Sequence, residues 1–416
     1  MSISLLAGKV QTVLGVINPE QMEVTLPHEH IISDGSAWFV EPAEATEKKM
    51  ARAPVSLESL WWIRYHWFQN HDDMLMLDEE EAVAELMHFQ WAGGRTVVEM
   101  SNIGLGRDPL ALARISRRTG LNILMGSGYY FGASLPRGFE AKTEEEITDE
   151  IVRDITIGVA NTGIKAGYIG EIGTSWPIDP REIKSLRAAV KAQKITGANL
   201  NIHPGQAEQA VFEVLKIIED AGADLSRTTM DHIDRAVRDP KNRLRLLEKG
   251  LTLEYDLFGR EGYYPLQQRL IDLPTDHQRI NEIIELIKAG FIKQILISSD
   301  IWNKHQRRTY GGWGYDHILR NVLPRMRVKG ITDEQIHTLQ VDNPRRVVHL
   351  RRCASPSSLR RTTQVRLTPQ VLRALHLELF TKPSLWRLFT RSSILLSPSI
   401  PAQVIGEPWG ISTVND

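Results

Sequence analysis

Short apolar segments alternate with longer amphipathic segments along most of this sequence, and that repeat restricts the fold more than any other feature. The expected strands begin at residues 23, 96, 122, 167, 198, 228, 251 and 294, and a segment with helical features follows each of them. Such alternation is typical of a parallel sheet covered by helices. Eight units spread over about 320 residues predict a closed (β/α)8 TIM barrel.

An open, doubly wound sheet is the alternative arrangement of the same elements. Such sheets often bind dinucleotides, and the Gly-x-Gly-x-x-Gly motif of that class follows none of the early strands. We therefore favour the barrel and expect it to occupy residues 1–350.

Two N-terminal segments stand outside the repeat. Residues 9–16 alternate polar and apolar side chains, residues 18–20 have turn composition, and residues 23–31 read as the next strand, which predicts an N-terminal β-hairpin. Residues 33–70 are rich in aromatic side chains, among them Trp38, Trp67 and Phe68. These aromatics form either a lid beside the first barrel strand or, as we favour, a helix packed on the core.

The repeat ends near Pro344, and residues 351–416 differ in composition. This C-terminal extension is rich in Ser, Arg, Leu and Pro, and its nine Lys and Arg residues stand against only three acidic ones. Beyond a short helical pattern at residues 371–379, little periodicity is present. We expect a poorly ordered, basic tail that lies outside the barrel and has no function of its own. The alternative is an arm that binds a partner.

Composition excludes several classes of protein. The chain has 416 residues, 42% hydrophobic and 24% charged, with a net charge of −1, which argues against binding to nucleic acid or an anionic membrane. Neither a signal peptide nor a run of 18 apolar residues is present, so no membrane span is expected. We expect a cytoplasmic enzyme with a small-molecule substrate. A homodimer is an assembly that the sequence leaves undecided.

His28 and His30 form the first candidate metal-binding motif. Because side chains alternate along a strand, both imidazoles lie on one face while Glu29 points away. A single cysteine, Cys353, excludes a Cys-rich metal site, so His and carboxylates must supply any ligands. Alone, a His-x-His pair is weak evidence, because two hydrogen-bonded histidines explain it equally well.

Five of the eight strands end in residues of the same chemical type. In a TIM barrel these ends meet at one mouth, where active sites lie. The metal-ligand candidates at these ends are His28, His30, Glu171, His203, His232 and Asp300. Separate structural roles would require all six to reach matching positions by accident, so we interpret them as one site.

Six ligands exceed the number that one tetrahedral zinc ion with an open position needs, and they suit two divalent metals with a shared bridge. His28, His30 and Asp300 would hold one ion, and His203 and His232 the other, with Glu171 between them. We expect Zn²⁺ at both positions because imidazoles dominate the set. A hydroxide bridging the ions would be the nucleophile, and Asp300 would be the catalytic proton shuttle.

Several sequence segments resemble one known family. They are Gly8-Lys-Val-Gln-Thr-Val-Leu-Gly15, Leu26-Pro-His-Glu-His30, Gly167-Tyr-Ile-Gly-Glu-Ile-Gly-Thr-Ser-Trp176, Ile202-His-Pro-Gly205, Asp231-His-Ile-Asp-Arg235, Leu253-Glu-Tyr-Asp-Leu-Phe-Gly259 and Tyr310-Gly-Gly-Trp-Gly-Tyr-Asp-His-Ile318. Together they resemble the phosphotriesterase-related proteins, in the phosphotriesterase branch of the amidohydrolase superfamily. The resemblance implies a (β/α)8 barrel with two zinc ions at the ligands named above.

The resemblance also narrows the expected substrate. Many members of the branch bridge the metals with a carboxylated lysine, whereas Glu171 stands at that position here, as in the phosphotriesterase-related subgroup. Efficient phosphotriester hydrolysis is therefore less expected than hydrolysis of a small amide, such as an N-acetylated amino acid or N-acetyltaurine. A lactonase or phosphotriesterase on the same metals is one alternative, and a non-catalytic barrel that acts as a binding protein is another.

Substrate-binding candidates follow from their positions beside the strand ends. Tyr129 lies just past the third strand, Arg235 just past the sixth, and Tyr255 in the seventh. Arg107 and Lys304 are further cations that could receive an acidic substrate group. We also expect the aromatic residues of segment 33–70 to narrow the mouth so that a small acyl group fits.

Overall fold

The computed structural model describes residues 7–266 and 269–351. Its central element is a parallel eight-stranded sheet in the order β14-β11-β10-β9-β8-β7-β6-β3. The strands are β3 (Thr25–Glu29), β6 (Thr96–Glu99), β7 (Asn122–Ser127), β8 (Tyr168–Gly173), β9 (Leu200–His203), β10 (Thr228–Met230), β11 (Thr252–Tyr255) and β14 (Ile295–Ile297). All eight predicted strands are present, and the predicted TIM barrel is confirmed.

Backbone hydrogen bonds bring the first and last strands together. The amide of Asp300 donates to the carbonyl of His28 at 3.3 Å, and the amide of His30 donates to that of Ile301 at 3.2 Å. These bonds nearly close the sheet and set the ends of β3 and β14 side by side, so that their terminal residues reach the same mouth.

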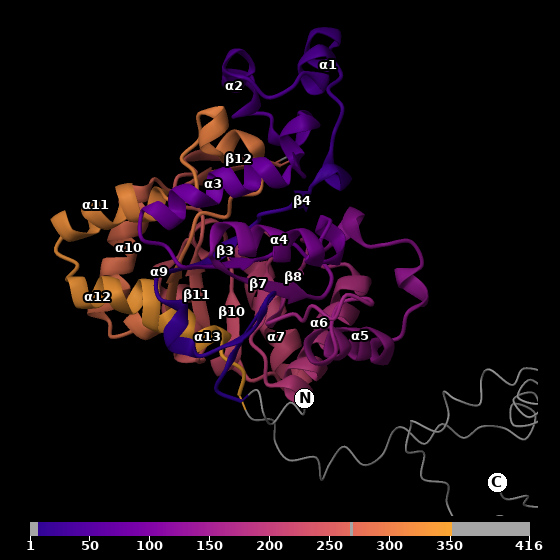
Figure 1. Cartoon of the computed structure of the whole chain (residues 1–416), viewed down its shortest axis with the longest axis vertical. Coiled ribbons are helices and arrows are strands. Elements are labelled where there is room, and N and C mark those ends of the chain that lie inside the picture. The colour runs from indigo at the N-terminus through magenta and orange to yellow at the C-terminus, as the bar shows by residue number, and fades with distance from the viewer. Residues whose placement is uncertain (1–6, 267–268, 352–416) are drawn as a thin grey trace, which may run out of the picture. The chain divides into compact units, whose positions relative to one another are not determined.

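Helices cover the outside of the barrel (Figure 1). The helices that follow the strands are α3 (Glu79–Trp91), α4 (Pro109–Thr119), α5 (Glu144–Thr156), α6 (Pro180–Thr196), α7 (Glu208–Ala221), α8 (Ile233–Ala236), α9 (Pro240–Glu248), α10 (Asp276–Lys288) and α11 (Leu323–Val328). A capping box opens α5, where the Glu146 amide donates to Thr143 Oγ1 at 3.2 Å. Among the described residues, no helix combines the length and hydropathy that crossing a bilayer requires.

The N-terminal hairpin is present, but its pairing differs from the prediction. β1 (Val10–Thr12) pairs antiparallel with β2 (Gly15–Ile17), whereas β3 pairs in parallel with β6. The hairpin closes early because Gly15 adopts a φ of 129° and the Thr12 hydroxyl bonds across the turn to its carbonyl at 2.8 Å. Alternation over residues 9–16 therefore came from two short strands and not from one.

Two excursions leave the regular repeat at the mouth of the barrel. Between β3 and α3 the chain forms β4 (Ser33–Asp34), α1 (Ala45–Arg52), α2 (Leu57–Ile63) and β5 (Leu75–Met76). Between β11 and α10 it forms the hairpin β12 (Gly262–Leu266) and β13 (Arg269–Leu273). In Figure 1, α1 and α2 stand at the top of the view, close to the label of β12.

The two excursions pack against each other and against the last strand's loop. Trp67, Leu257 and Leu273 form a small buried cluster, with Phe68 and Trp302 packed on it. The predicted helix in segment 33–70 exists as α2, but its buried Trp62 and Ile63 belong to a separate small cluster and not to the main core.

At the C-terminal end of the described residues, α12 (Asp333–His337) and α13 (Asn343–Val348) complete the described chain. The predicted disorder of the tail lies outside the described residues.

Candidate metal centre

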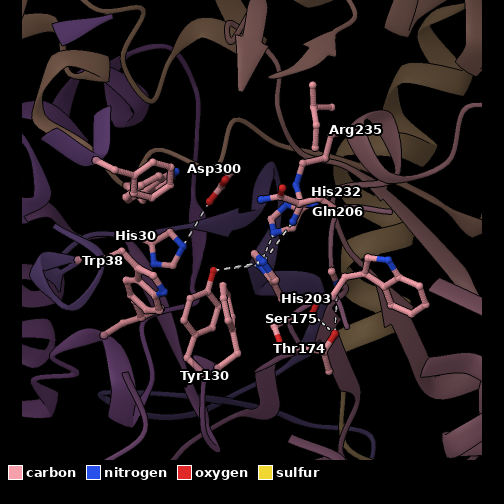
Figure 2. A pocket seen from close by; sticks show the side chains of 18 of the residues that line it. His30, Trp38, Tyr130, Thr174, Ser175, His203, Gln206, His232, Arg235 and Asp300 are labelled. Atoms are coloured by element: carbon pink, nitrogen blue, oxygen red, sulfur yellow. Dashed lines mark hydrogen bonds and ion pairs between the residues drawn. The ribbon is translucent and has the colours of Figure 1, made fainter. Parts of the chain in front are cut away.

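The six predicted ligands come together at the C-terminal mouth of the barrel. Four lie at the strand ends as expected: His28 in β3, His30 one residue beyond it, Glu171 within β8, and His203 at the end of β9. His232 and Asp300 follow β10 and β14 and adopt positive φ values of 53° and 46°. All six are buried, and Figure 2 shows His30, His203, His232 and Asp300 turned toward one another.

Glu171 occupies the middle of the group. Its Oε2 lies 3.0 Å from His203 Nδ1 and 3.5 Å from His232 Nε2. The same oxygen lies 3.8 Å from His28 Nε2, while Oε1 lies 3.5 Å from His30 Nε2. One carboxylate therefore faces all four imidazoles with both oxygens, which is the disposition expected of a bridge between two ions.

Asp300 lies on the other side of the first two histidines. Its Oδ1 is 3.3 Å from His30 Nε2 and 3.6 Å from His28 Nε2. The other oxygen accepts a bond of 3.2 Å from Arg260 Nη1, and Arg260 Nη2 donates to the Asp300 carbonyl at 2.6 Å. Two bonds from one guanidinium thus fix both the backbone and the side chain of Asp300.

Glu29 points away from the metal side, as predicted, and anchors the loop that carries Asp300. Its Oε1 accepts bonds from the Ser298 hydroxyl at 2.8 Å and from the Ser299 amide at 2.9 Å. Its Oε2 accepts a bond of 2.8 Å from the Ile301 amide. Burial raises the pKa of Glu29 to about 7, although these donors oppose the shift.

The donor atoms fit divalent cations. Three groups place one ligand atom per residue within 4.8 Å of each other. Two consist of predicted ligands, namely His28, His30 and Asp300, and His28, Glu171 and His232; the third joins His28 to Asp231, Glu254 and Asp256. Within the described chain, His28 Nε2 and Glu171 Oε1 are buried without a hydrogen-bond partner. Buried polar atoms are seldom left unsatisfied, and nitrogen and carboxylate donors suit zinc-like ions. These residues thus match a metal site, while the number and identity of the ions stay predictions.

Residues behind the ligands orient the imidazole rings. His30 Nδ1 lies 3.0 Å from Ser101 Oγ, and His232 Nδ1 lies 2.8 Å from Asp256 Oδ1. His28 Nδ1 lies 3.4 Å from Glu254 Oε2. In each case the ring nitrogen that faces Glu171 or Asp300 is the other one, so the contacts behind the ring leave that nitrogen available as a ligand.

Burial and neighbouring charges shift the pKa values in opposite directions. Burial, reinforced by Arg235, lowers the pKa of both His203 and His232 well below the usual value, which favours neutral rings. Burial raises the pKa of Glu171 to about 8, although His28 opposes the shift. Burial also lowers the pKa of His28, but Asp256 and Glu254 outweigh it and raise the pKa well above normal. Neutral rings at His203 and His232, beside a buried Glu171 carboxyl that needs a counter-charge to ionise, are the electrostatic setting of a cation site.

A cavity of about 870 Å³ opens onto these ligands. His30, His203, His232 and Asp300 line one part of it, together with Arg235. The volume lies toward the upper end of the ~300–1,000 Å³ that is common for ligand sites. The narrow mouth stays a prediction. Trp38 and Phe68 of the aromatic segment do line the cavity, which agrees, for these two side chains, with the alternative of a lid beside the first barrel strand.

The three predicted substrate-binding residues occupy different positions. Arg235 lines the cavity, where its Nη2 donates to His203 Nε2 at 3.1 Å and to the Pro204 carbonyl at 3.3 Å. Tyr129 and Tyr255 are buried and do not line it. The Tyr129 hydroxyl donates instead to Glu150 and accepts a bond of 2.7 Å from Lys142. We therefore leave both tyrosines out of the proposed substrate site.

Neighbouring residues occupy the positions that these tyrosines were expected to fill. The Tyr130 hydroxyl lies 3.0 Å from His203 Nδ1 and faces the cavity (Figure 2). Arg107 and Lys304, the other predicted cations, pair with Asp154 at 3.0 Å and with Asp72 at 2.6 Å. Both are therefore committed to ion pairs away from the cavity lining.

Sequence reasoning missed Arg260. It follows β11 by five positions, and its guanidinium lies 5.1 Å from the Trp67 ring centre and 5.9 Å from that of Trp302. Its position beyond a strand end was the only feature of the sequence that could have indicated a role at the mouth. Its contacts could not be predicted, because its partners come from two loops that are distant in the sequence.

Comparison with known proteins agrees with this geometry. An N-acetyltaurine hydrolase from Dictyostelium discoideum is 38% identical over 362 residues, covering 82% of this chain and 98% of that protein. A phosphotriesterase-related protein from Nematostella vectensis is 38% identical over 342 residues, with 82% and 98% covered. The crystal structure of a resiniferatoxin-binding protein from Rhodobacter sphaeroides matches with a TM-score of 0.80 at 36% identity, covering 82% of this chain and 96% of that one. Residues 8–348 match the Phosphotriesterase family, and the chain belongs to that family.

Proposed function

We propose that this protein is a hydrolase that uses two divalent metal ions, expected to be Zn²⁺, to cleave the amide of an N-acyl amino acid or of N-acetyltaurine. The observation that carries the proposal is the set of four imidazoles and two carboxylates at one mouth of the barrel, where Glu171 lies among the histidines and four of the six residues line a cavity that also holds Arg235. The name of the Dictyostelium relative, an N-acetyltaurine hydrolase, points to the same substrate class.

The proposed ligand assignment follows the distances. His28, His30 and Asp300 would hold one ion, and His203 and His232 would hold the other. Glu171 would contribute one carboxylate oxygen to each. Two divalent ions, when bound, lower the pKa of a water molecule and polarise the carbonyl under attack.

Asp300 is the proposed catalytic residue. Burial would raise the pKa of its carboxyl, but Arg260 and His30 outweigh that effect and hold the pKa below its usual value. The ionised carboxylate can accept a proton from the attacking water and return it to the departing amine nitrogen. The contacts with Arg260 hold the carboxylate at the site during both transfers.

Arg235 is the proposed receptor for the acidic group of the amine portion. Its guanidinium borders the cavity beside His203 and can bind a sulfonate or carboxylate through two parallel N–H bonds. Taurine and amino acid products carry such a group, whereas simple lactones and aryl phosphotriesters do not.

The test is a side-by-side assay on zinc-loaded protein of known metal content. N-acetyltaurine and N-acetyl amino acids are compared with a lactone and an aryl phosphotriester. We expect the N-acetyl amides to give the highest kcat/KM. Faster turnover of the lactone or phosphotriester would favour that alternative, and turnover of none of them would favour a non-catalytic binding protein. A cytoplasmic location and a homodimer stay predictions.

A further inference from the structure

The cavity above the proposed metal site is larger than an acetyl amide needs. Its volume is about 870 Å³. N-acetyltaurine has only about ten non-hydrogen atoms, whereas cavities of ~300–1,000 Å³ usually hold drug-sized ligands. Space therefore remains beside the reacting carbonyl for a larger substituent.

One side of the cavity is apolar. Trp38 from the first excursion packs against Phe131 with ring centres 5.4 Å apart, and Phe68 packs against Trp302 at 5.7 Å. All four side chains line the cavity and are partly exposed. Because each aromatic already contacts a partner, the wall is formed before a ligand arrives and costs little side-chain entropy on binding.

The opposite side is polar, and Arg235, Gln206 and Thr174 line it. Arg260, the other arginine of the lining, lies beside Trp302 and forms an ion pair with Asp300. Figure 2 shows Arg235 and Gln206 on one side and Trp38 on the other, with His30, His203 and Asp300 between them. A ligand that spans the cavity thus passes over the proposed metal ligands between an apolar end and a cationic end.

The groups of an N-acyl amino acid follow the same order as the lining of the cavity. The acyl chain lies on one side of the scissile carbonyl, and the acid group lies on the other. We propose that the preferred substrates carry an apolar acyl chain longer than acetyl, bound along Trp38, Phe68, Phe131 and Trp302, with the acid group at Arg235. This assignment rests on the proposed amide hydrolase function and specifies its acyl group.

The first experiment varies only the acyl chain. Zinc-loaded full-length protein is assayed with N-acetyl-, N-butanoyl- and N-hexanoyltaurine. Burial of each added methylene can contribute up to about fourfold in kcat/KM, so we expect hexanoyl to exceed acetyl by at least about tenfold. A ratio of one or less would overturn the acyl-chain assignment and leave the amide hydrolase function intact.

A binding measurement keeps this test independent of turnover. Calorimetry on the zinc-loaded protein compares the products acetate and hexanoate. Hexanoate should bind at least about tenfold more tightly, because only its chain reaches the aromatic wall. Equal affinities would overturn the assignment even if hydrolysis is observed. Tighter hexanoate binding without hydrolysis of any acyltaurine would support the pocket and reject the proposed function.

Two variants test whether the preference for the longer acyl chain comes from the aromatic wall. Trp38→Ala should lower the hexanoyl-to-acetyl ratio by about tenfold, since it removes most of one wall side chain. Trp61→Ala is the matched control, because Trp61 is 68% exposed on α2 and does not line the cavity. An unchanged ratio in Trp38→Ala, or an equal fall in Trp61→Ala, would contradict the assignment of this wall.

Discussion

The two ends of the barrel strands are filled in opposite ways. At the C-terminal end, buried histidines and carboxylates leave atoms such as His28 Nε2 and Glu171 Oε1 without hydrogen bonds in the described chain. Toward the N-terminal end, Val10, Met22 and Leu296 belong to a closed apolar cluster that α13 covers with its valines. At one end, buried ligand-type atoms find no hydrogen-bond partner within the described chain, while the other end is packed by its own side chains.

This difference separates function from stability within one sheet. Unsatisfied buried polar groups cost free energy, so the mouth is stabilised by what binds there. Apolar contacts at the other end offset that cost without any ligand. Substitutions at the two ends should therefore change different quantities, and four predictions test whether they do.

The largest effect is expected from Glu171→Gln at the mouth. The amide retains one acceptor oxygen but loses the negative charge that faces all four histidines, so both ions should bind less tightly. We expect fewer than two metals per chain by elemental analysis and a loss of activity of more than about 100-fold.

Glu85→Gln is the matched control for that variant. Glu85 is also a buried glutamate, but its carboxylate accepts bonds from the backbone amides of Arg308 and Thr309 at 3.0 and 2.8 Å, away from the cavity lining. This control should keep its metals. A Glu171→Gln protein with two metals and full activity would remove Glu171 from the bridge position.

A smaller effect at the mouth comes from pH. Burial raises the pKa of Glu171 to about 8, so below that pH its carboxyl carries a proton that an incoming cation must displace. Metal affinity should therefore fall with decreasing pH, by up to about tenfold per pH unit below 8, and turnover should fall with it. Calorimetry in buffers of different protonation enthalpy measures the released proton. An affinity that stays constant from about pH 8 to pH 6 would contradict this.

The mouth was also where sequence reasoning succeeded best. A strand end is marked in the sequence by an apolar run, so a ligand-type residue next to it can be placed on the mouth from periodicity and fold class alone. His203 and Asp300 were placed at the mouth in this way. Arg235 was placed beside it because it follows His232 by three residues, and the roles of all three stay predictions.

Residues that reach the cavity from long loops could not be predicted in the same way. Trp302 and Arg260 meet where the second excursion packs on the loop after β14, and β12 and β13 were not recognised within the segment after β11. The prediction that Tyr129 and Tyr255 face the substrate was wrong for a related reason. One residue beyond or within a strand decides whether a side chain faces the cavity or the surrounding helices, and sequence alone leaves that register uncertain.

At the closed end, Leu296→Ala should affect stability and leave the chemistry unchanged. Leu296 is 2% exposed in the middle of β14, and its truncation leaves a cavity in the apolar cluster. We expect the free energy of unfolding to fall by about 2–5 kcal/mol with both metals retained. Denaturant unfolding and elemental analysis on the same sample measure the two quantities. Loss of metal from this variant would show that the two ends are coupled.

The smallest effect is expected from removing residues 352–416. All proposed metal ligands and cavity-lining residues lie between His28 and Trp302, and the family match ends at residue 348. The shortened chain should end at Arg351, because the Leu350 amide donates to the Lys9 carbonyl at 2.9 Å and the Arg351 amide to that of Gly197 at 3.3 Å. Those bonds hold residues 350 and 351 against the closed end of the barrel. We expect Tm to shift by less than about 4 °C and kcat/KM to stay unchanged. An insoluble or inactive product would show that the tail covers the barrel or forms an interface, and the closed end would then depend on it.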